Sequence, residues 1–98
     1  LGARLQELGS GGFSAYGIAK EDGGVELMEV PDGSVAARAG LKAGDLLLKI
    51  NESKALKVGQ IRRLTEESDT RPLTLKIVRD KTHMTLTLFA AGETYEIQ

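Results

Sequence analysis

The stretch that decides the fold is GSVAARAGLKAGDLLLKIN, residues 33–51. Ser34 is a typical N-cap for a short helix over residues 35–39, and Gly40 can adopt the left-handed conformation that ends it. A second glycine turn follows, and residues 45–51 then predict a strand. Its unbroken Leu-Leu-Leu run indicates burial on both faces. A one-turn helix, two glycine turns and a buried strand in such close succession restrict the fold strongly.

The composition indicates one small globular domain. The chain has 98 residues, of which 41% are hydrophobic, 28% charged and 4% aromatic, so its core must be built from Leu, Ile, Val and Ala. The formal net charge of -1 gives no strong electrostatic case for binding nucleic acid or anionic membranes. No apolar run approaches the ~20 residues of a membrane span. Without cysteine there is neither a disulfide nor a thiolate metal site, and we expect the chain to be a piece of a larger protein.

Two more strands are predicted on the N-terminal side of this stretch. Hydrophobic and polar residues alternate over residues 2–8, which is typical of a strand with one buried face. A second strand is expected over residues 25–30, ended by Pro31. Between the two lie the glycine-rich residues 9–12 and then residues 13–16, which can form a single helical turn.

A longer helix is predicted over residues 58–67. Apolar side chains recur there at helical spacing, and the charged residues from Arg62 to Glu67 occupy the opposite, solvated side. Lys57 would stand at the N-cap, where Ser, Thr, Asp or Asn is favoured, so we expect the start of this helix to fray.

The C-terminal part predicts a β-hairpin. Residues 73–78 and 84–89 both alternate cleanly between apolar and polar side chains. The turn between them falls at Asp80-Lys81.

The order of these elements and three short motifs resemble the PDZ domains of bacterial HtrA-type serine proteases. Residues 1–8, LGARLQEL, look like the carboxylate-binding loop and peptide-pairing strand of those domains. Residues 40–45, GLKAGD, resemble the turn common to bacterial PDZ domains. Residues 61–64, IRRL, resemble the helix that forms the other wall of their groove. The likeness extends from Leu1 to about Ala90.

The resemblance implies an α+β fold, a small PDZ-like and partly open β-sandwich or barrel of about five to six strands capped by two helices. It also implies the permuted bacterial topology, in which the strand at residues 84–90 takes the place of a strand before the carboxylate loop. The expected PDZ domain spans residues 1–91, and residues 92–98 form a tail or an extra edge strand.

The resemblance further implies a peptide-recognition module without catalytic residues, metal or cofactor. An extended peptide would pair with strand 2–8 by β-augmentation, in a groove whose other wall is helix 58–67. Backbone N–H groups around Gly2 would hold the peptide's terminal carboxylate, and Lys57 would favour an acidic or polar third residue from the peptide's end. The expected peptide-binding residues are Leu1, Gly2, Ala3, Arg4, Leu5, Lys57, Ile61, Leu64 and Thr65.

The expected partners are peptide or protein C-termini with apolar ends and the other domains of the parent chain, with no nucleic acid and no membrane insertion. By the same resemblance the parent would be a bacterial protease in the periplasm or another extracytoplasmic compartment. The domain would bind its substrates or regulate it.

Departures from the family pattern leave an alternative open. Ala3 stands where a larger apolar residue is frequent, and residues 93–98 could occupy the strand edge. The chain could therefore be a structural or docking domain with an unused or self-occupied groove. Glu52 follows Asn51 where glycine is common, so that turn must form without its easiest residue. An independent hydrolase is disfavoured, because His83 is the only histidine and no nucleophile constellation accompanies it.

Overall fold

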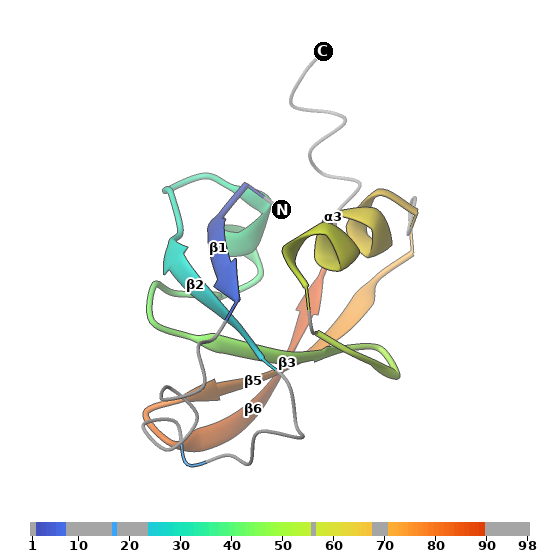
Figure 1. Ribbon diagram of the computed structural model, residues 1–98. Coiled ribbons are helices and arrows are strands. Elements are labelled where there is room, and N and C mark those ends of the chain that lie inside the picture. The colour runs from blue at the N-terminus through green and yellow to red at the C-terminus, as the bar shows by residue number, and fades with distance from the viewer. Residues whose placement is uncertain (1, 8–16, 18–23, 56, 68–70, 90–98) are drawn as a thin grey trace.

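The computed structural model describes residues 2–7, 17, 24–55, 57–67 and 71–89. The strands of this part of the chain form one antiparallel sheet of six strands in the order β1-β2-β3-β5-β6, with β4 paired to β3 (Figure 1). The elements are β1 (Arg4–Glu7), β2 (Val25–Glu29), α2 (Val35–Arg38), β3 (Leu46–Ile50), β4 (Ser53–Lys54), α3 (Val58–Glu67), β5 (Leu73–Arg79) and β6 (Thr82–Leu88). The helical turn expected at residues 13–16 and the tail 92–98 lie outside the described residues.

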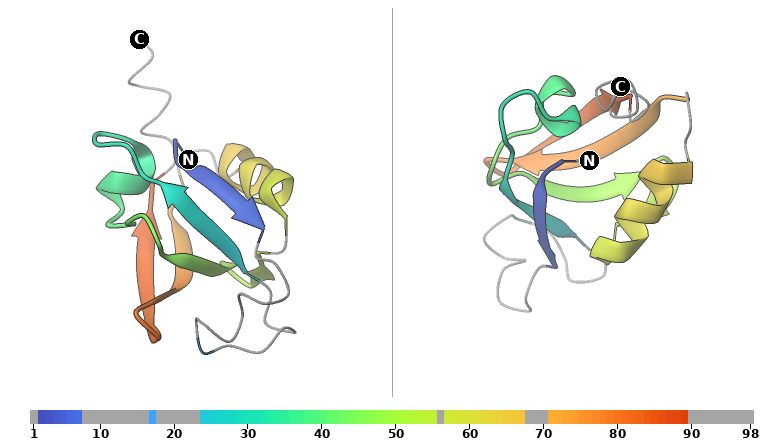
Figure 2. Two further views of the ribbon diagram at one scale, coloured as in Figure 1. Left: turned by 60° about the vertical axis from the view of Figure 1, so that its left-hand side comes forward. Right: turned by 90° about the horizontal axis from the view of Figure 1, so that it is seen from above.

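The sheet is curved and open. β1 and β6 stand at opposite ends of the pairing order, and no pairing joins them among the described strands. α3 packs beside β1 and α2 packs against β6, so the helices cover separate parts of the sheet (Figures 1 and 2). The predicted partly open α+β architecture is therefore confirmed, including the place of the C-terminal strand β6 beside β5.

The core is aliphatic, as the composition requires. Leu46, Leu47 and Leu48 are all buried, which confirms the predicted burial of this strand on both faces. Leu47 belongs to the main core cluster, whereas Leu46 and Leu48 pack with Val78 in a second cluster. The main cluster also contains Ile61 of α3, and side chains from α2, so both helices share this core.

The short helix α2 is held by local signals at both ends. At its start, Ser34 Oγ accepts a hydrogen bond from the Ala37 N–H at 3.1 Å. At its end, the Gly40 N–H donates to Ala37 O at 3.0 Å and the Leu41 N–H donates to Ala36 O at 3.1 Å. These two bonds, with Gly40 at φ +94°, make a Schellman motif. Both the predicted cap and the predicted glycine stop are confirmed.

The hairpin also follows the prediction. β5 and β6 pair in unbroken register from Leu73↔Leu88 to Arg79↔Thr82. Asp80 and Lys81 have φ angles of 51° and 62°, and a two-residue loop with both φ values positive is a type I′ turn. Neither residue is glycine, so this turn keeps some backbone strain.

The turn between β3 and β4 forms through Asn51, which takes the left-handed position at φ 55°. Its side-chain Oδ1 accepts the Thr74 N–H at 2.9 Å, and its own N–H donates to Thr74 O at 2.7 Å. The turn forms although Glu52, and not glycine, follows Asn51, because Asn tolerates the left-handed conformation and its side chain gains a hydrogen-bond partner.

Asp45 joins the glycine turn to the sheet. Its carboxylate is buried and receives both Arg79 Nε at 2.8 Å and Arg79 Nη2 at 2.7 Å. The same carboxylate accepts the Lys42 N–H at 2.9 Å, and Arg79 Nη2 also donates to Gly40 O at 2.8 Å. Hydrogen bonding to Asp45 raises the pKa of Arg79 above its ordinary value, partly offset by desolvation, so the guanidinium stays charged.

Removing either partner of this ion pair is expected to destabilise the fold unequally. The Asp45 side chain is 2% exposed and the Arg79 side chain 22%, so Arg79→Met leaves a buried charge whereas Asp45→Asn leaves one that reaches water. We expect Arg79→Met to lower the free energy of unfolding by about 3 kcal/mol. Asp45→Asn should lower it by about 1–2 kcal/mol. Urea titrations followed by circular dichroism measure both, and a larger loss for Asp45→Asn would contradict the argument.

Relieving the backbone strain in the hairpin turn is expected to stabilise the protein. Lys81→Gly removes the β-carbon at φ 62°, and we expect the free energy of unfolding to rise by about 0.5–1 kcal/mol. Lys81→Ala removes the same charge but keeps the β-carbon, so it should give no such gain. Thermal denaturation of the two variants compares them directly, and an equal effect would point to charge rather than backbone strain.

Candidate functional site

A groove lies between β1 and α3. Its volume is about 360 Å³. β1 contributes one wall and α3 the other, and Figure 2 shows the two elements next to each other in both views. The lining residues are Gly2, Ala3, Arg4, Leu5, Val58, Ile61 and Arg62.

β1 offers this groove an open strand edge. It is the last strand of the pairing order and hydrogen-bonds to β2 alone among the described strands. Ala3 and Leu5 are half-buried and pack against the core cluster, whereas Arg4 and Gln6 are exposed. The predicted alternation is therefore confirmed, and the unpaired backbone edge can extend the sheet by one more strand.

The start of β1 has an irregular backbone. Gly2 lies just before the strand with φ +80°, a conformation that L side chains rarely adopt. Within the strand the pairing steps from Arg4↔Glu29 to Leu5↔Leu27, so Met28 of β2 has no opposite residue and forms a bulge. A bulge increases local twist, and this one lies beside the groove.

The start of α3 is tied to the end of β1. Glu7 Oε2 accepts the Val58 N–H at 3.4 Å, and Glu7 Oε1 lies 3.7 Å from Lys57 Nζ. Gln60 adds a second anchor, because its Oε1 accepts the Lys57 N–H at 3.3 Å and its Nε2 donates to Lys54 O at 2.7 Å. Gln60, at the third helical position, thus makes one of the two hydrogen bonds of a capping box. The other is missing, because the Lys57 side chain has no oxygen that could accept a backbone N–H. The expected fraying of this helix start stays a prediction.

The structure brings some of the sequence-predicted site residues to the groove and not others. Gly2, Ala3, Arg4, Leu5 and Ile61 line it. The other predicted site residues that the structure describes do not line it.

Three of them lie elsewhere on or beside α3. Lys57 is exposed and lies next to Glu7. Leu64 is half-buried and packs against the core. Thr65 is buried, and its Oγ1 donates a hydrogen bond to Arg62 O at 2.9 Å. Leu1 lies outside the described residues.

Sequence reasoning missed Val58 and Arg62. Val58 stands one turn before Ile61 on the predicted apolar face, so its helical spacing was the signal for it. Arg62 is exposed, as expected for the charged side of the helix, but it also lines the groove. Consecutive residues on a helix are only about 100° apart, so Arg62 leaves the helix near the edge of the face that Ile61 occupies.

The part of the chain that the structure describes contains no group of three or more His, Cys, Asp or Glu side chains that could hold a metal ion. Nor does any helix there have the length and apolar character needed to cross a membrane. His83 is exposed on β6 opposite Val78 and is no part of the groove.

Comparison with known proteins identifies the family. A family model described as PDZ domain matches residues 27–79. The chain belongs to the PDZ domain family. It is a binding domain and not a catalytic one, and the open edge of β1 beside α3 is where this PDZ domain has its groove.

One similar curated protein is the "Probable periplasmic serine endoprotease DegP-like" of Chlamydia pneumoniae. It is 31% identical over 77 residues, which cover 79% of this chain. Those residues cover only 16% of the length of that relative.

Two solved structures share the fold. The HtrA3 PDZ domain bound to a phage-derived ligand, FGRWV, has a TM-score of 0.76 at 18% identity and covers 91% of this chain and 81% of its own. The HtrA-type protease AlgW, as its S227A variant with a decapeptide, has a TM-score of 0.75 at 22% identity and covers 91% of this chain and 27% of its own.

The Gln60 anchor is expected to stabilise the helical wall of this PDZ domain. Gln60→Ala removes both hydrogen bonds at the start of α3, and we expect the free energy of unfolding to fall by about 1 kcal/mol. Gln6→Ala, at an exposed position on β1, is the control and should have little effect. Urea denaturation measures both variants, and equal stability of Gln60→Ala and the parent protein would refute the anchoring role.

Proposed function

We propose that this PDZ domain binds extended peptides by β-augmentation, with the peptide antiparallel to β1 in the groove between β1 and α3. The observation that carries this proposal is the unpaired edge of β1, which borders a groove with an apolar floor. An added strand would satisfy the free N–H and C=O groups of β1, and these main-chain bonds supply affinity without regard to sequence.

The floor of the groove supports a preference for apolar residues at the peptide's end. Ala3, Leu5 and Val58 are half-buried and pack on the core, and Ile61 is fully buried behind them. Because Ala3 is small, the pocket retains room for a larger apolar side chain of the ligand. We propose that backbone N–H groups of residues 1–3 receive the terminal carboxylate, since Gly2 has no side chain to obstruct its approach.

We further propose that the chain is the substrate-binding or regulatory domain of a larger bacterial protease in an extracytoplasmic compartment. The 31% identity to a protein named as a probable periplasmic serine endoprotease supports this. In such a parent, residues 1–91 form the PDZ domain, and its partners are apolar C-termini and neighbouring domains of the same chain.

The proposal is tested with fluorescent peptides that end in apolar residues, each compared with its C-amidated twin. We expect dissociation constants on the order of micromolar for the free acids, because the groove is shallow and the peptide must be ordered on binding. Amidation should weaken binding at least about tenfold, which corresponds to about 1.4 kcal/mol.

Two variants complete this experiment. Gly2→Glu places a charged side chain at the mouth of the groove and should abolish binding, whereas Thr85→Glu adds the same charge at an exposed position on β6 and should not. Circular dichroism verifies that both are folded. Failure of the folded parent protein to bind any peptide would refute the proposal, and binding that appears only after removal of residues 93–98 would show a self-occupied groove.

A further inference from the structure

Arg62 differs from the other basic side chains at the groove in having no acidic partner within the described part of the chain. Arg4 lines the same groove, but its Nη2 lies 2.8 Å from Glu29 Oε1. Lys57, which precedes the lining residue Val58 but does not line the groove, has its Nζ 3.7 Å from Glu7 Oε1. No Asp or Glu is among the described residues that line the groove. Within the described residues, no carboxylate therefore balances the charge of Arg62 at the groove.

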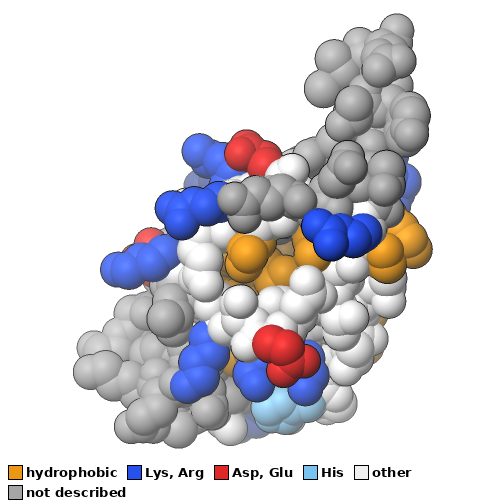
Figure 3. All heavy atoms as spheres, turned by 90° about the vertical axis from the view of Figure 1, so that its right-hand side faces the viewer, with side chains coloured by type: hydrophobic (Ala, Val, Ile, Leu, Met, Phe, Trp, Pro, Cys, Tyr) orange, Lys and Arg blue, Asp and Glu red, His pale blue; other side chains and the backbone are white. Residues whose placement is uncertain are grey.

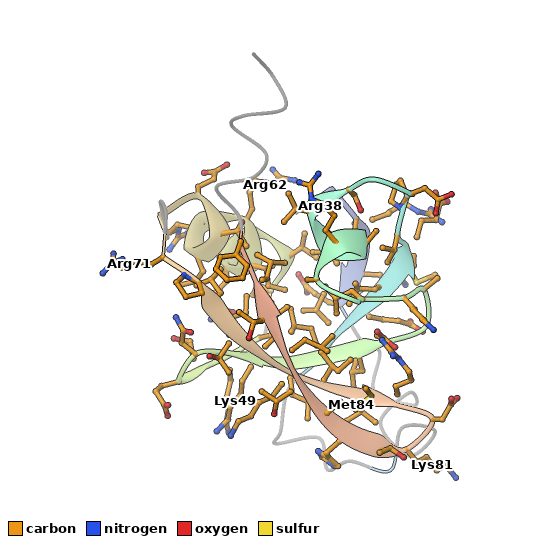
Figure 4. All side chains as sticks on the ribbon, turned by 180° about the vertical axis from the view of Figure 1, so that it is seen from behind. Arg38, Lys49, Arg62, Arg71, Lys81 and Met84 are labelled. Atoms are coloured by element: carbon orange, nitrogen blue, oxygen red, sulfur yellow. The ribbon has the colours of Figure 1, made fainter. Side chains whose placement is uncertain are left out.

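Basic side chains are also prominent on the side of the molecule to which α3 belongs (Figure 3). Arg62 lies on α3, and Figure 4 shows it at the same end of the molecule as Arg38 of α2. Among the described side chains on the face nearest α3, Lys and Arg are more prominent than Asp and Glu (Figure 3). A basic neighbourhood of this kind attracts a negatively charged peptide.

The proposed binding mode determines which part of a peptide can reach Arg62. A peptide paired with β1 keeps its backbone about 4.8 Å from that strand, and its side chains alternate between the two faces of the sheet. The residues of α3 stand across the groove, so they meet side chains rather than the peptide backbone. The partner of Arg62 is then an ionised side chain next to the apolar floor.

We propose that Arg62 is a specificity-determining residue of this groove and pairs with an Asp or Glu side chain of the bound peptide. This inference rests on the proposed function. The preferred ligand combines an apolar end, which Leu5, Val58 and Ile61 accommodate, with an acidic residue close to it. The planar guanidinium suits a carboxylate because two N–H groups can donate to its two oxygens.

The test uses pentapeptides with one apolar last residue and Asp, Glu, Asn or Gln at each preceding position in turn. At low salt we expect the parent protein to prefer one acidic peptide over its amide counterpart by about three- to fivefold. Arg62→Gln should remove that preference, so that the variant binds each acidic peptide and its amide counterpart with the same dissociation constant. Added salt should weaken the preference in the parent protein.

Arg63→Gln is the matched control. Arg63 is exposed on the same helix, directly beside Arg62 in sequence, and does not line the groove. Its replacement changes the net charge equally and should keep the acidic preference. A charge-reversed pair, Arg62→Glu with lysine-containing peptides, should restore discrimination in the opposite sense.

The possible outcomes distinguish the role of Arg62 from the proposed peptide binding on which it rests. If neutral peptides bind and no acidic preference exists, or if Arg63→Gln removes it as fully as Arg62→Gln, the role of Arg62 is refuted and peptide binding stands. If no peptide binds the folded protein, both are refuted.

Discussion

The ion pair between Asp45 and Arg79 is the interaction on which the rest of the structure depends. Asp45 stands at the end of the glycine turn that follows α2, and Arg79 is the last residue of β5. The pair joins two segments 34 positions apart, and Arg79 also binds the carbonyl of Gly40 at the end of α2. Without Arg79, the Lys42 N–H would be the one donor left to the buried carboxylate among the described residues. The turn, the central strand β3 and the hairpin are thereby held in one arrangement.

This arrangement leaves β1 at the edge of the sheet. β3 is paired on both sides, by β2 and β5, and β2 is paired by β1 and β3. Of these strands, β1 alone has a side that no described strand pairs with. The hairpin of β5 and β6 forms the other end of the sheet, where β6 packs against α2. The edge beside α3 is therefore a consequence of strand order rather than of any residue in β1.

Among the described residues, the hydrogen bond and the ion pair that join the two walls of the groove both lie at one end of it. Glu7 joins the end of β1 to the start of α3 through Val58 and Lys57. Ile61 anchors the middle of the helix in the core, which keeps the helix on the domain without closing the groove. The wall that a peptide would meet is thus apolar at its base, with Arg62 at its edge.

Much of the fold was predictable because its signals are local. Ser34 and Gly40 specify the ends of α2, the spacing of apolar residues specifies α3, and two alternating segments around Asp80-Lys81 specify the hairpin. Each of these depends on backbone preferences and side-chain periodicity over a few neighbouring residues. The strand of residues 2–8 was predictable for the same reason, although it is shorter in the structure.

By itself, the sequence determined the elements, the aliphatic core and the family resemblance, because those follow from short-range patterns. Only the tertiary structure decided which side chains line the groove. Arg62 enters it, Leu64 packs inward, and Lys57 is paired with Glu7, a residue far away in the chain. These outcomes depend on the distance and rotation between β1 and α3, and packing of the whole core sets both.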